Sequence, residues 1–308
     1  METNIYDLII IGGGPAGLTA GIYAARSGLN TVLLERAALG GQIISTDWIE
    51  NYPGFAEGLS GPDLVDGMTA QARRFDLKIL AEAVESVDLS GEIKIVNLAT
   101  DTLAARTIII ASGASPRKLG IPGEDRFYGR GVSFCATCDG PFYKDKIIAA
   151  VGGGDTAVQE SIYLTRFVKK VYLIHRRDQL RAAKILQKRA IANDKIEFIW
   201  NSVVTDINGG LTNVDSITVK NVKTEKMRDL VVAGCFIWVG IQPNTDYLKN
   251  SIKLDENGFI ITNSAMGTSV PGVFAAGDVR NTHLRQVATA VGDAAVAAVS
   301  AERFLENK

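Results

Sequence analysis

Cysteine is scarce in this sequence, which has three cysteines among 308 residues. A small secreted domain stabilised by disulfides would carry a much denser set. Histidine is scarcer still, with two residues in the whole chain. A zinc site needs about four Cys, His or carboxylate ligands, and beyond one Cys-x-x-Cys pair the chain offers no second pair at such spacing. We therefore expect neither a disulfide scaffold nor a bound metal.

The chain also lacks an excess of positive or of negative charge, since 33 Lys and Arg residues and 34 Asp and Glu residues leave a net charge of −1. This balance gives no electrostatic reason to expect binding to nucleic acid or to an anionic membrane. Uninterrupted apolar runs long enough to span a membrane are missing too. The most apolar long stretch, 286–305, contains Asp293, Glu302 and Arg303, which suits a packed helix better than a membrane span. We expect no nucleic-acid partner and no membrane segment.

Residues 1–7 show no basic region, apolar stretch or cleavage site typical of a secretory signal peptide. A cytoplasmic location is therefore expected, and in that reducing compartment a Cys-x-x-Cys pair is more often catalytic or metal-binding than structural. Hydrophobic residues at 46% and charged residues at 22% are typical of a globular protein. The length of 308 residues favours two domains over a single core.

Two segments of the chain share one order of expected elements. Segment 7–36 reads as a buried apolar strand, a glycine-rich turn, a helix and a second strand, and segment 146–177 repeats that order. A Gly-x-Gly-x-x-Gly or Ala pattern is weak evidence alone, but between a strand and a helix it predicts a dinucleotide-binding unit. We therefore predict an α/β fold with two Rossmann-like, doubly wound nucleotide-binding domains.

The residue that ends the second strand of such a unit contacts the adenosine ribose and indicates which nucleotide binds. The first unit ends in Glu35, whose carboxylate suits a free ribose 2′-hydroxyl, as in FAD or NAD. The second ends in 175–177, "HRR", with Arg181 close behind. Guanidinium groups suit a phosphate dianion, which favours NADPH over NADH. The alternative is a solvated basic strand end.

Two further segments fit the enclosure of a flavin. "TIIIASGASP" (107–116) and "GVFAAGDV" (272–279) each read as an apolar strand that ends in small residues beside a turn. Small side chains at strand ends leave room for a bulky cofactor. Asp278 could accept a hydrogen bond from a ribityl hydroxyl, or it could serve as a helix N-cap; the two roles are compatible.

The segment "SFCATCDGPF" places Cys135 and Cys138 three residues apart, directly before Asp139. A metal clip lacks further ligands, and a static crosslink across two residues would constrain the unfolded chain very little. Thiol–disulfide exchange, in which a thiolate attacks, is the interpretation that remains. Asp139 could then protonate a departing thiolate or reduced flavin, although Asp-Gly-Pro is also typical of a turn. Cys235, in "VVAGCFIWVG", is expected to be a buried strand residue.

A set of short motifs extends along the whole chain. They are "GGGPAG" (12–17), "GGQI" (40–43), "ENYPG" (50–54), "CATCDG" (135–140), "GGGDTA" (152–157), "HRRDQLRA" (175–182), "VGIQPNT" (239–245), "AAGDV" (275–279) and "RQV" (285–287). With these motifs the chain resembles the low-molecular-weight bacterial thioredoxin reductases from end to end. The cysteine motif joined to the next two motifs is the most specific part of the resemblance.

The resemblance implies a thioredoxin-disulfide reductase that passes electrons from NADPH through FAD and a Cys135–Cys138 disulfide to oxidised thioredoxin. It implies a discontinuous FAD-binding domain, 1–114 and 246–308, with the NADPH-binding domain, 115–245, inserted in it and carrying the redox pair. The domains of this family rotate between half-reactions, and "GASPR" (113–117) and "QPNTD" (242–246) are the expected hinges. A homodimer formed through the FAD domain is also expected.

The expected site residues fall into three sets. Catalysis is assigned to Cys138 facing the flavin, to Cys135 attacking thioredoxin, and to Asp139. The residues expected to bind FAD are Gly12, Gly14, Pro15, Ala16, Gly17, Glu35, Arg36, Gly41, Gln42, Asn51, Val84, Ala111, Gly113, Gly277, Asp278, Arg285, Gln286 and Val287. Those expected to bind NADPH are Gly152, Gly154, Asp155, Thr156, His175, Arg176, Arg177 and Arg181.

Two other functions remain open from the sequence. One is a flavin-dependent reductase of a different dithiol carrier, either glutaredoxin-like or peroxidase-linked. The other is a redox sensor in which the cysteine pair switches an interaction without turnover. Steady NADPH oxidation with purified thioredoxin would exclude the sensor.

Overall fold

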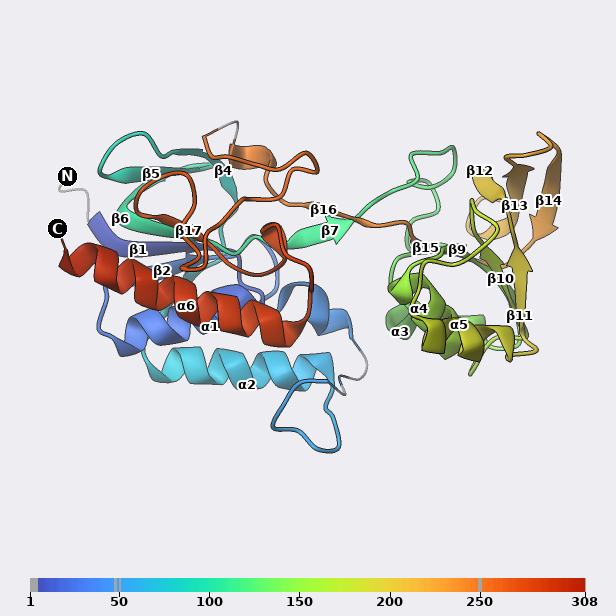
Figure 1. Ribbon diagram of the computed structural model, residues 1–308, viewed down its shortest axis with the longest axis horizontal. Coiled ribbons are helices and arrows are strands. Elements are labelled where there is room, and N and C mark those ends of the chain that lie inside the picture. The colour runs from blue at the N-terminus through green and yellow to red at the C-terminus, as the bar shows by residue number, and fades with distance from the viewer. Residues whose placement is uncertain (1–4, 47–48, 50, 249–250, 308) are drawn as a thin grey trace. The chain divides into compact units, whose positions relative to one another are not determined.

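The computed structural model describes residues 5–46, 49, 51–248 and 251–307. The chain divides into two compact units. The first consists of Met1–Ser115 and Gln242–Lys308, and the second is Pro116–Ile241. The second unit is thus inserted within the sequence of the first. Figure 1 labels most of the helices and strands of both units.

The first unit is built on a mixed seven-stranded sheet with the order β3-β2-β1-β6-β5-β4, in which β17 also pairs with β6. Its strands are β1 (Ile5–Ile11), β2 (Thr31–Leu34), β3 (Lys78–Leu80), β4 (Val84–Asp88), β5 (Lys94–Leu98), β6 (Thr102–Ile110) and β17 (Val273–Ala275). Strands β3, β2, β1, β6 and β17 pair in parallel, whereas β5 is antiparallel to its neighbours. The central parallel strands β1, β2 and β17 are mostly apolar and buried, as strands covered on both faces should be, whereas the edge strand β3 is partly exposed.

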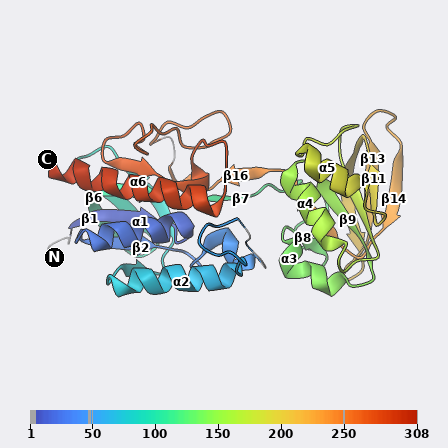
Figure 2. The ribbon, with the colours of Figure 1, turned by 60° about the horizontal axis from the view of Figure 1, so that its bottom comes forward.

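Three helices pack together on one face of this sheet (Figures 1 and 2). They are α1 (Pro15–Arg26), α2 (Gly61–Arg74) and α6 (Val287–Glu306). The first unit also contains three short 3₁₀ turns, η1 (Gly41–Ser45), η3 (Asp246–Leu248) and η4 (Gly277–Val279). Helix α2 begins after Ser60, whose hydroxyl accepts a hydrogen bond from the N–H of Asp63 at 3.1 Å. The buried face of α6 consists of alanines, which lets α6 approach α1 closely.

The second unit contains a parallel five-stranded sheet with the order β11-β10-β9-β15-β8, and a three-stranded antiparallel sheet, β12-β13-β14. The parallel strands are β8 (Val132–Ser133), β9 (Ile147–Gly152), β10 (Lys170–Ile174), β11 (Ile196–Ile199) and β15 (Cys235–Trp238). The antiparallel strands are β12 (Ser202–Gly209), β13 (Val214–Asn221) and β14 (Met227–Val231). The helical segments are α3 (Ala136–Asp139), η2 (Gly140–Tyr143), α4 (Asp155–Leu164) and α5 (Lys184–Ile191).

The two units repeat one βαβ arrangement, β1-α1-β2 in the first and β9-α4-β10 in the second. A Cβ on Gly12, just after β1, would lie 2.4 Å from the carbonyl oxygen of Ala111. A Cβ on Gly152, at the end of β9, would lie 2.4 Å from that of Trp238. Both glycines thus permit the same close contact with a neighbouring parallel strand end. The predicted α/β fold with two Rossmann-like domains is confirmed.

The chain passes between the units through β7 (Ala114–Pro116) and β16 (Ile241–Pro243), which pair as a two-stranded sheet. The observed boundaries fall at 115/116 and 241/242. The binding of FAD by one unit and NADPH by the other stays a prediction. None of the helices in the described part of the chain combines the length and apolarity that a membrane span requires.

Gly17 provides a test of the packing between helix α1 and the turn that precedes it. A Cβ on Gly17 would lie 1.7 Å from the backbone oxygen of Gly12, so main chain would have to move. We expect Gly17→Ala to lower the free energy of unfolding by about 2 kcal/mol, the usual cost of overpacking. Urea unfolding curves measure this change.

Gly67 is the matched control, because it is exposed within α2 and a Cβ there would meet nothing within 4 Å. Gly67→Ala should raise stability by about 0.5–1 kcal/mol, since alanine is the better helix former. Equal stabilities for the two variants would contradict the packing assigned to Gly17.

Candidate functional site

A cavity of about 390 Å³ opens in the first unit at the carboxyl ends of its parallel strands. Thirteen of the residues expected to bind FAD line it. They are Gly12, Gly14, Pro15, Ala16, Glu35, Arg36, Gly41, Gln42, Ala111, Gly113, Asp278, Gln286 and Val287. The cavity therefore brings together segments that lie far apart in the sequence.

The N-terminus of α1 forms one wall of this cavity without any covering side chain. Gly14 is the N-cap residue, no side chain caps the helix, and its first turn contains no acid. Gly41 faces it from the next loop, where an added Cβ would lie 3.4 Å from the Cα of Gly14. Unpaired N–H groups and the helix dipole favour an anion at such a position. The uncapped N–H groups of α1 and the open cavity beside Gly14 and Gly41 fit a pyrophosphate group.

Glu35 is held in a fixed orientation where β2 ends. Its Oε2 accepts a hydrogen bond from the N–H of Gly13 at 2.7 Å, and its Oε1 accepts one from the N–H of Ala37 at 2.9 Å. A carboxylate has about four acceptor positions, so two remain for ligand hydroxyls. Glu35 lines the cavity, and this geometry fits a free ribose.

Asp278 lies in η4 and also lines the cavity. Burial raises the pKa of Asp278, the Arg285 guanidinium lowers it and Asp293 raises it again. Arg285 does not line the cavity. Its Nε donates to the carbonyl oxygen of Asp278 at 3.4 Å, and its guanidinium lies 4.1 Å from the centre of the Phe259 ring. Arg285 thus supports the turn that carries Asp278.

Four other expected FAD residues lie outside the cavity lining. Asn51 contacts a residue of the lining, since its Nδ2 donates a hydrogen bond to the Oε1 of Gln286 at 2.8 Å. Gly17 and Gly277 belong to tight packing around α1, and Val84 starts β4 beside an apolar cluster. The sequence did not name the remaining lining residues individually, although six of them lie within the quoted segments 40–43, 107–116, 239–245 and 272–279. The remaining lining residues are Ala37, Ala38, Ile43, Ile44, Ser112, Ala114, Ser115, Asn244, Ala276 and Ala290.

A second glycine turn joins β9 to α4 in the second unit. Gly154 is the N-cap of α4, where no side chain caps the helix and an added Cβ would meet nothing within 4 Å. Asp155 in the first turn accepts a hydrogen bond from the N–H of Ala183 at 2.6 Å, and Thr156 is exposed. Asp155 therefore ties the start of α5 to the glycine turn.

The basic residues that follow β10 differ sharply in burial. His175 is 5% exposed, and its Nε2 has no hydrogen-bond partner among the described residues. Burial lowers the pKa of His175, and Arg181, Arg177 and Arg176 lower it further, in that order. The neutral ring therefore presents an unused acceptor or donor beside exposed guanidinium groups.

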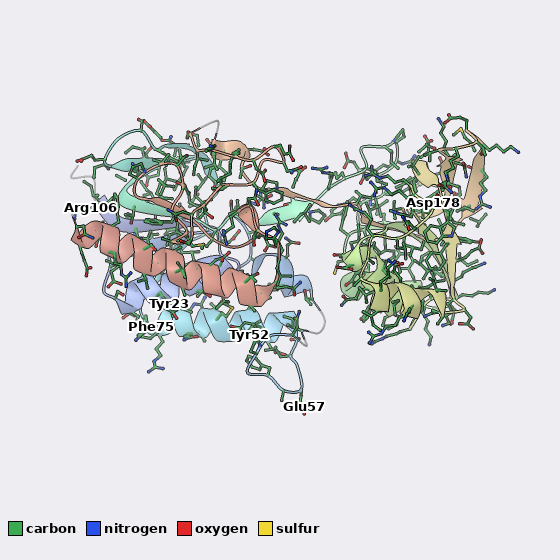
Figure 3. The ribbon with its side chains drawn as sticks, viewed as in Figure 1. Tyr23, Tyr52, Glu57, Phe75, Arg106 and Asp178 are labelled. Carbon is green, nitrogen blue, oxygen red and sulfur yellow. The ribbon has the colours of Figure 1, made fainter. Side chains whose placement is uncertain are left out.

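Those guanidinium groups have no acidic partner in the described part of the chain. Asp178, the acid nearest in sequence and labelled in Figure 3, binds Lys223 instead, with Oδ2 to Nζ at 3.0 Å. Three exposed arginines without counter-ions beside a glycine turn fit a phosphate dianion.

The cysteine segment lies between β8 and η2 in the second unit. Cys135 is half-buried and forms a disulfide, while the side chain of Cys138 lies outside the described part of the structure. The Ser133 hydroxyl accepts a hydrogen bond from the N–H of Cys135 at 3.0 Å and donates to its carbonyl oxygen at 3.1 Å. The N–H of Asp139 donates to the same carbonyl oxygen at 3.3 Å. Main-chain and serine bonds therefore hold the backbone of Cys135.

Cys235 behaves as the sequence predicts. It is a fully buried free thiol in β15, and burial raises its pKa to about 12. A thiol with such a pKa supplies almost no thiolate near neutral pH, so Cys235 cannot serve as the attacking sulfur. Among the described residues no group of His, Cys, Asp and Glu is arranged to hold a metal ion.

Asp139 is half-buried and lines a separate cavity of about 430 Å³ within the second unit. Arg130, Phe142, Tyr143 and Lys146 line the same cavity. The structure therefore places Asp139 close in the chain to the disulfide-bonded Cys135 and beside an open space. Its role as a proton donor stays a prediction.

Comparisons with known proteins match almost the whole chain. A family model described as pyridine nucleotide-disulphide oxidoreductase matches residues 6–294. The thioredoxin reductase of Peptoclostridium acidaminophilum is 44% identical over 98% of each chain. That of Bacillus subtilis (strain 168) is 44% identical over 99% of this chain and 96% of its own.

Solved structures give the same result. Lactococcus lactis thioredoxin reductase, in a structure described as the FR conformation, is 45% identical with a TM-score of 0.92, over 98% of this chain and 100% of that chain. Thioredoxin reductase from T. acidophilum is 34% identical with a TM-score of 0.87, over 98% of both chains. The resemblance seen in the motifs is therefore confirmed. The chain belongs to the pyridine nucleotide-disulphide oxidoreductase family and, within it, to the thioredoxin reductases.

Proposed function

We propose that this protein uses FAD and NADPH to reduce the disulfide of oxidised thioredoxin. The observation that carries the proposal is the disulfide at Cys135 in a chain that also has two glycine turns suited to nucleotides. The thioredoxin reductases that match the chain over nearly its full length support the same function.

The cavity of the first unit supplies the groups that FAD requires. The bare N-terminus of α1 would face the pyrophosphate, Glu35 would accept bonds from the adenosine ribose, and Asp278 would contact the ribityl chain. When bound, FAD supplies a carrier that takes a hydride from a nicotinamide and gives an electron pair to a disulfide. The protein's part is to bind and orient this carrier.

The second unit supplies selection for NADPH. The guanidinium groups of Arg176, Arg177 and Arg181 would bind the 2′-phosphate. Among the described residues no Asp or Glu pairs with them, so they are available for a phosphate group. The neutral ring of His175 would bond a nucleotide group through its unused Nε2. The glycine turn before α4 would carry the pyrophosphate.

The cysteine pair would exchange with thioredoxin in two balanced steps. The thiolate of Cys135 attacks one sulfur of the thioredoxin disulfide, and the other thioredoxin sulfur leaves as a thiolate. Cys138 then attacks the sulfur of Cys135, which re-forms the protein's disulfide and releases reduced thioredoxin. Asp139 would supply a proton to a leaving thiolate. Rotation of the two units between half-reactions belongs to the same proposal.

A homodimer in the cytoplasm completes the proposal. Tyr23, which is 39% exposed on α1, lies on the helical side of the first unit, where Phe75 after α2 is half-buried against the core (Figure 3). Aromatic side chains at a surface of this kind favour contact with a second copy. Sedimentation that finds only monomers at micromolar concentration would exclude this part of the proposal.

The central experiment separates flavin reduction from thioredoxin reduction. Cys138→Ser removes the sulfur proposed to exchange with the flavin. We expect NADPH still to reduce the flavin at close to the wild-type rate, and thioredoxin reduction to fall to background. Stopped-flow absorbance and a coupled thioredoxin assay measure the two rates.

Cys235→Ser is the control, because Cys235 is buried and holds no thiolate. That variant should retain both reactions. If Cys138→Ser reduced thioredoxin at the full rate, the proposed electron path would be wrong.

Nucleotide preference tests the arginine cluster. In a variant with Arg176→Ala and Arg177→Ala we expect the KM for NADPH to rise about 10–100-fold, because hydrogen bonds to charged groups contribute about 1.5–3 kcal/mol. The KM for NADH should change little. Lys223→Ala removes a nearby cation that already pairs with Asp178, so it should leave both values unchanged. An equal rise for both nucleotides in the double variant would contradict recognition of the 2′-phosphate.

A further inference from the structure

Asn244 joins two distant segments of the first unit at the wall of the cavity. Its Nδ2 donates to the carbonyl oxygen of Ser112 at 2.8 Å, and its Oδ1 accepts from the hydroxyl of Ser115 at 2.7 Å. Its N–H donates to the carbonyl oxygen of Gly113 at 3.0 Å, and its own carbonyl oxygen accepts from the hydroxyl of Ser112 at 2.8 Å. Every polar group of Asn244 therefore bonds a segment about 130 residues earlier in the chain, as the separation of 132 from Ser112 shows.

The earlier segment is also bonded by other side chains. The Nε2 of Gln42 donates to the carbonyl oxygen of Ala114 at 2.5 Å, and the hydroxyl of Tyr247 donates to that of Ser112 at 3.3 Å. Most of these residues line the cavity. They are Gln42, Ser112, Gly113, Ala114, Ser115 and Asn244. A ligand in the cavity would therefore touch the same hydrogen-bonded wall.

This wall continues directly into the two crossings between the units. Strand β7 starts at Ala114, and β16 ends at Pro243, next to Asn244. The two strands pair, and beyond them the N–H of Arg117 donates to the carbonyl oxygen of Gly240 at 2.8 Å. Two strands of three residues are marginal in water, so their pairing depends on what holds their ends. At the cavity side, the hydrogen bonds of Asn244 hold both strands.

A glycine with positive φ precedes each of the two crossing strands. Gly113 has a φ of 66° and Gly240 a φ of 128°, and a Cβ at either position would meet nothing within 4 Å. Crowding therefore does not require glycine at these positions, whereas the positive φ does. The carbonyl oxygens of both glycines also accept hydrogen bonds, Gly113 from Asn244 and Gly240 from Arg117, so these bonds hold the paired strands at both ends.

We propose that Asn244 is a positioning residue that fastens the two crossing strands to the wall of the flavin cavity, so that a bound flavin orders the crossing. This inference rests on the proposed binding of FAD in the first unit. A ligand that rigidifies one hydrogen-bonded network lowers the mobility of every segment in that network. Asn244 connects both strands to this network, because it directly follows β16 and its side chain bonds Ser115 in β7 and Ser112 in the wall.

Asn263 separates this role from ordinary loop support. Its Oδ1 accepts hydrogen bonds from the N–H groups of Ala265 and Gly267 at 3.0 and 2.9 Å, within the first unit. It does not line the cavity and lies on neither crossing. Asn263→Ala therefore removes a comparable set of amide bonds without touching the proposed connection.

Hydrogen exchange with and without saturating FAD tests the proposal on the full chain. In the wild type we expect FAD to slow exchange of the Asn244 and Arg117 amides by about fivefold or more, the lower end of typical couplings between sites. Asn244→Ala should still take up FAD, as judged from its absorbance, but lose most of that slowing. Asn263→Ala should keep it, even if its thermal stability falls.

Ser115→Ala provides a milder variant in case Asn244→Ala does not fold. It removes one of the two side-chain bonds of Asn244 and should lose part of the slowing. If FAD slowed amide exchange in the Asn244→Ala or Ser115→Ala protein as much as in the wild type, the inference would be overturned while the proposed function would stand. An equal loss in Asn263→Ala would also overturn the inference, because the effect would then be general loosening. A wild-type protein that bound no FAD would overturn both this inference and the proposed function.

Discussion

The contact of backbone with backbone at the ends of β1 and β9 is the constraint on which the rest of the structure depends. No side chain larger than hydrogen fits at Gly12 or Gly152, because the carbonyl oxygens of Ala111 and Trp238 occupy the space. This contact sets the start of each following helix against a neighbouring strand end. In the first unit the uncapped N-terminus of α1 lines the cavity, where an anionic group is favoured.

Two turns of similar geometry differ in the charge that surrounds them. The first has Glu35, fixed by two main-chain N–H groups, and the second has arginines without described acidic partners. The same backbone design thus accounts for two different nucleotides in one chain. The cysteine segment lies in the second unit, so the redox groups of the proposed reaction are divided between the units.

The sequence predicted the parts of the structure that depend on neighbours along the chain. The parallel sheets, the glycine turns and the position of Glu35 follow from alternation of strand, glycine and helix over about 30 residues. The hydrogen bonds that join Ser112 and Ser115 to Asn244 were not predicted, because they form only when β7 and β16 pair across a long separation. A motif containing Asn244 was recognised, but a motif alone does not reveal which main chain an amide will bond.

Two expected flavin residues bond residues of the cavity lining. Asn51 bonds Gln286, and Arg285 bonds the backbone of Asp278; contact of either residue with the flavin stays a prediction. Gly17 belongs to the glycine pattern because of helix packing against Gly12. Sequence patterns identify such residues as a group but do not separate contact with a ligand from support of a contact.

The most direct test of the account is an anaerobic titration of the oxidised, FAD-loaded protein with NADPH, followed by labelling of free thiols. The account predicts consumption of about two equivalents per chain, one for the flavin and one for the disulfide, because each accepts one electron pair. Cys135 should then be labelled. Consumption of one equivalent, with Cys135 still in its disulfide, would contradict the transfer of electrons from nucleotide to sulfur.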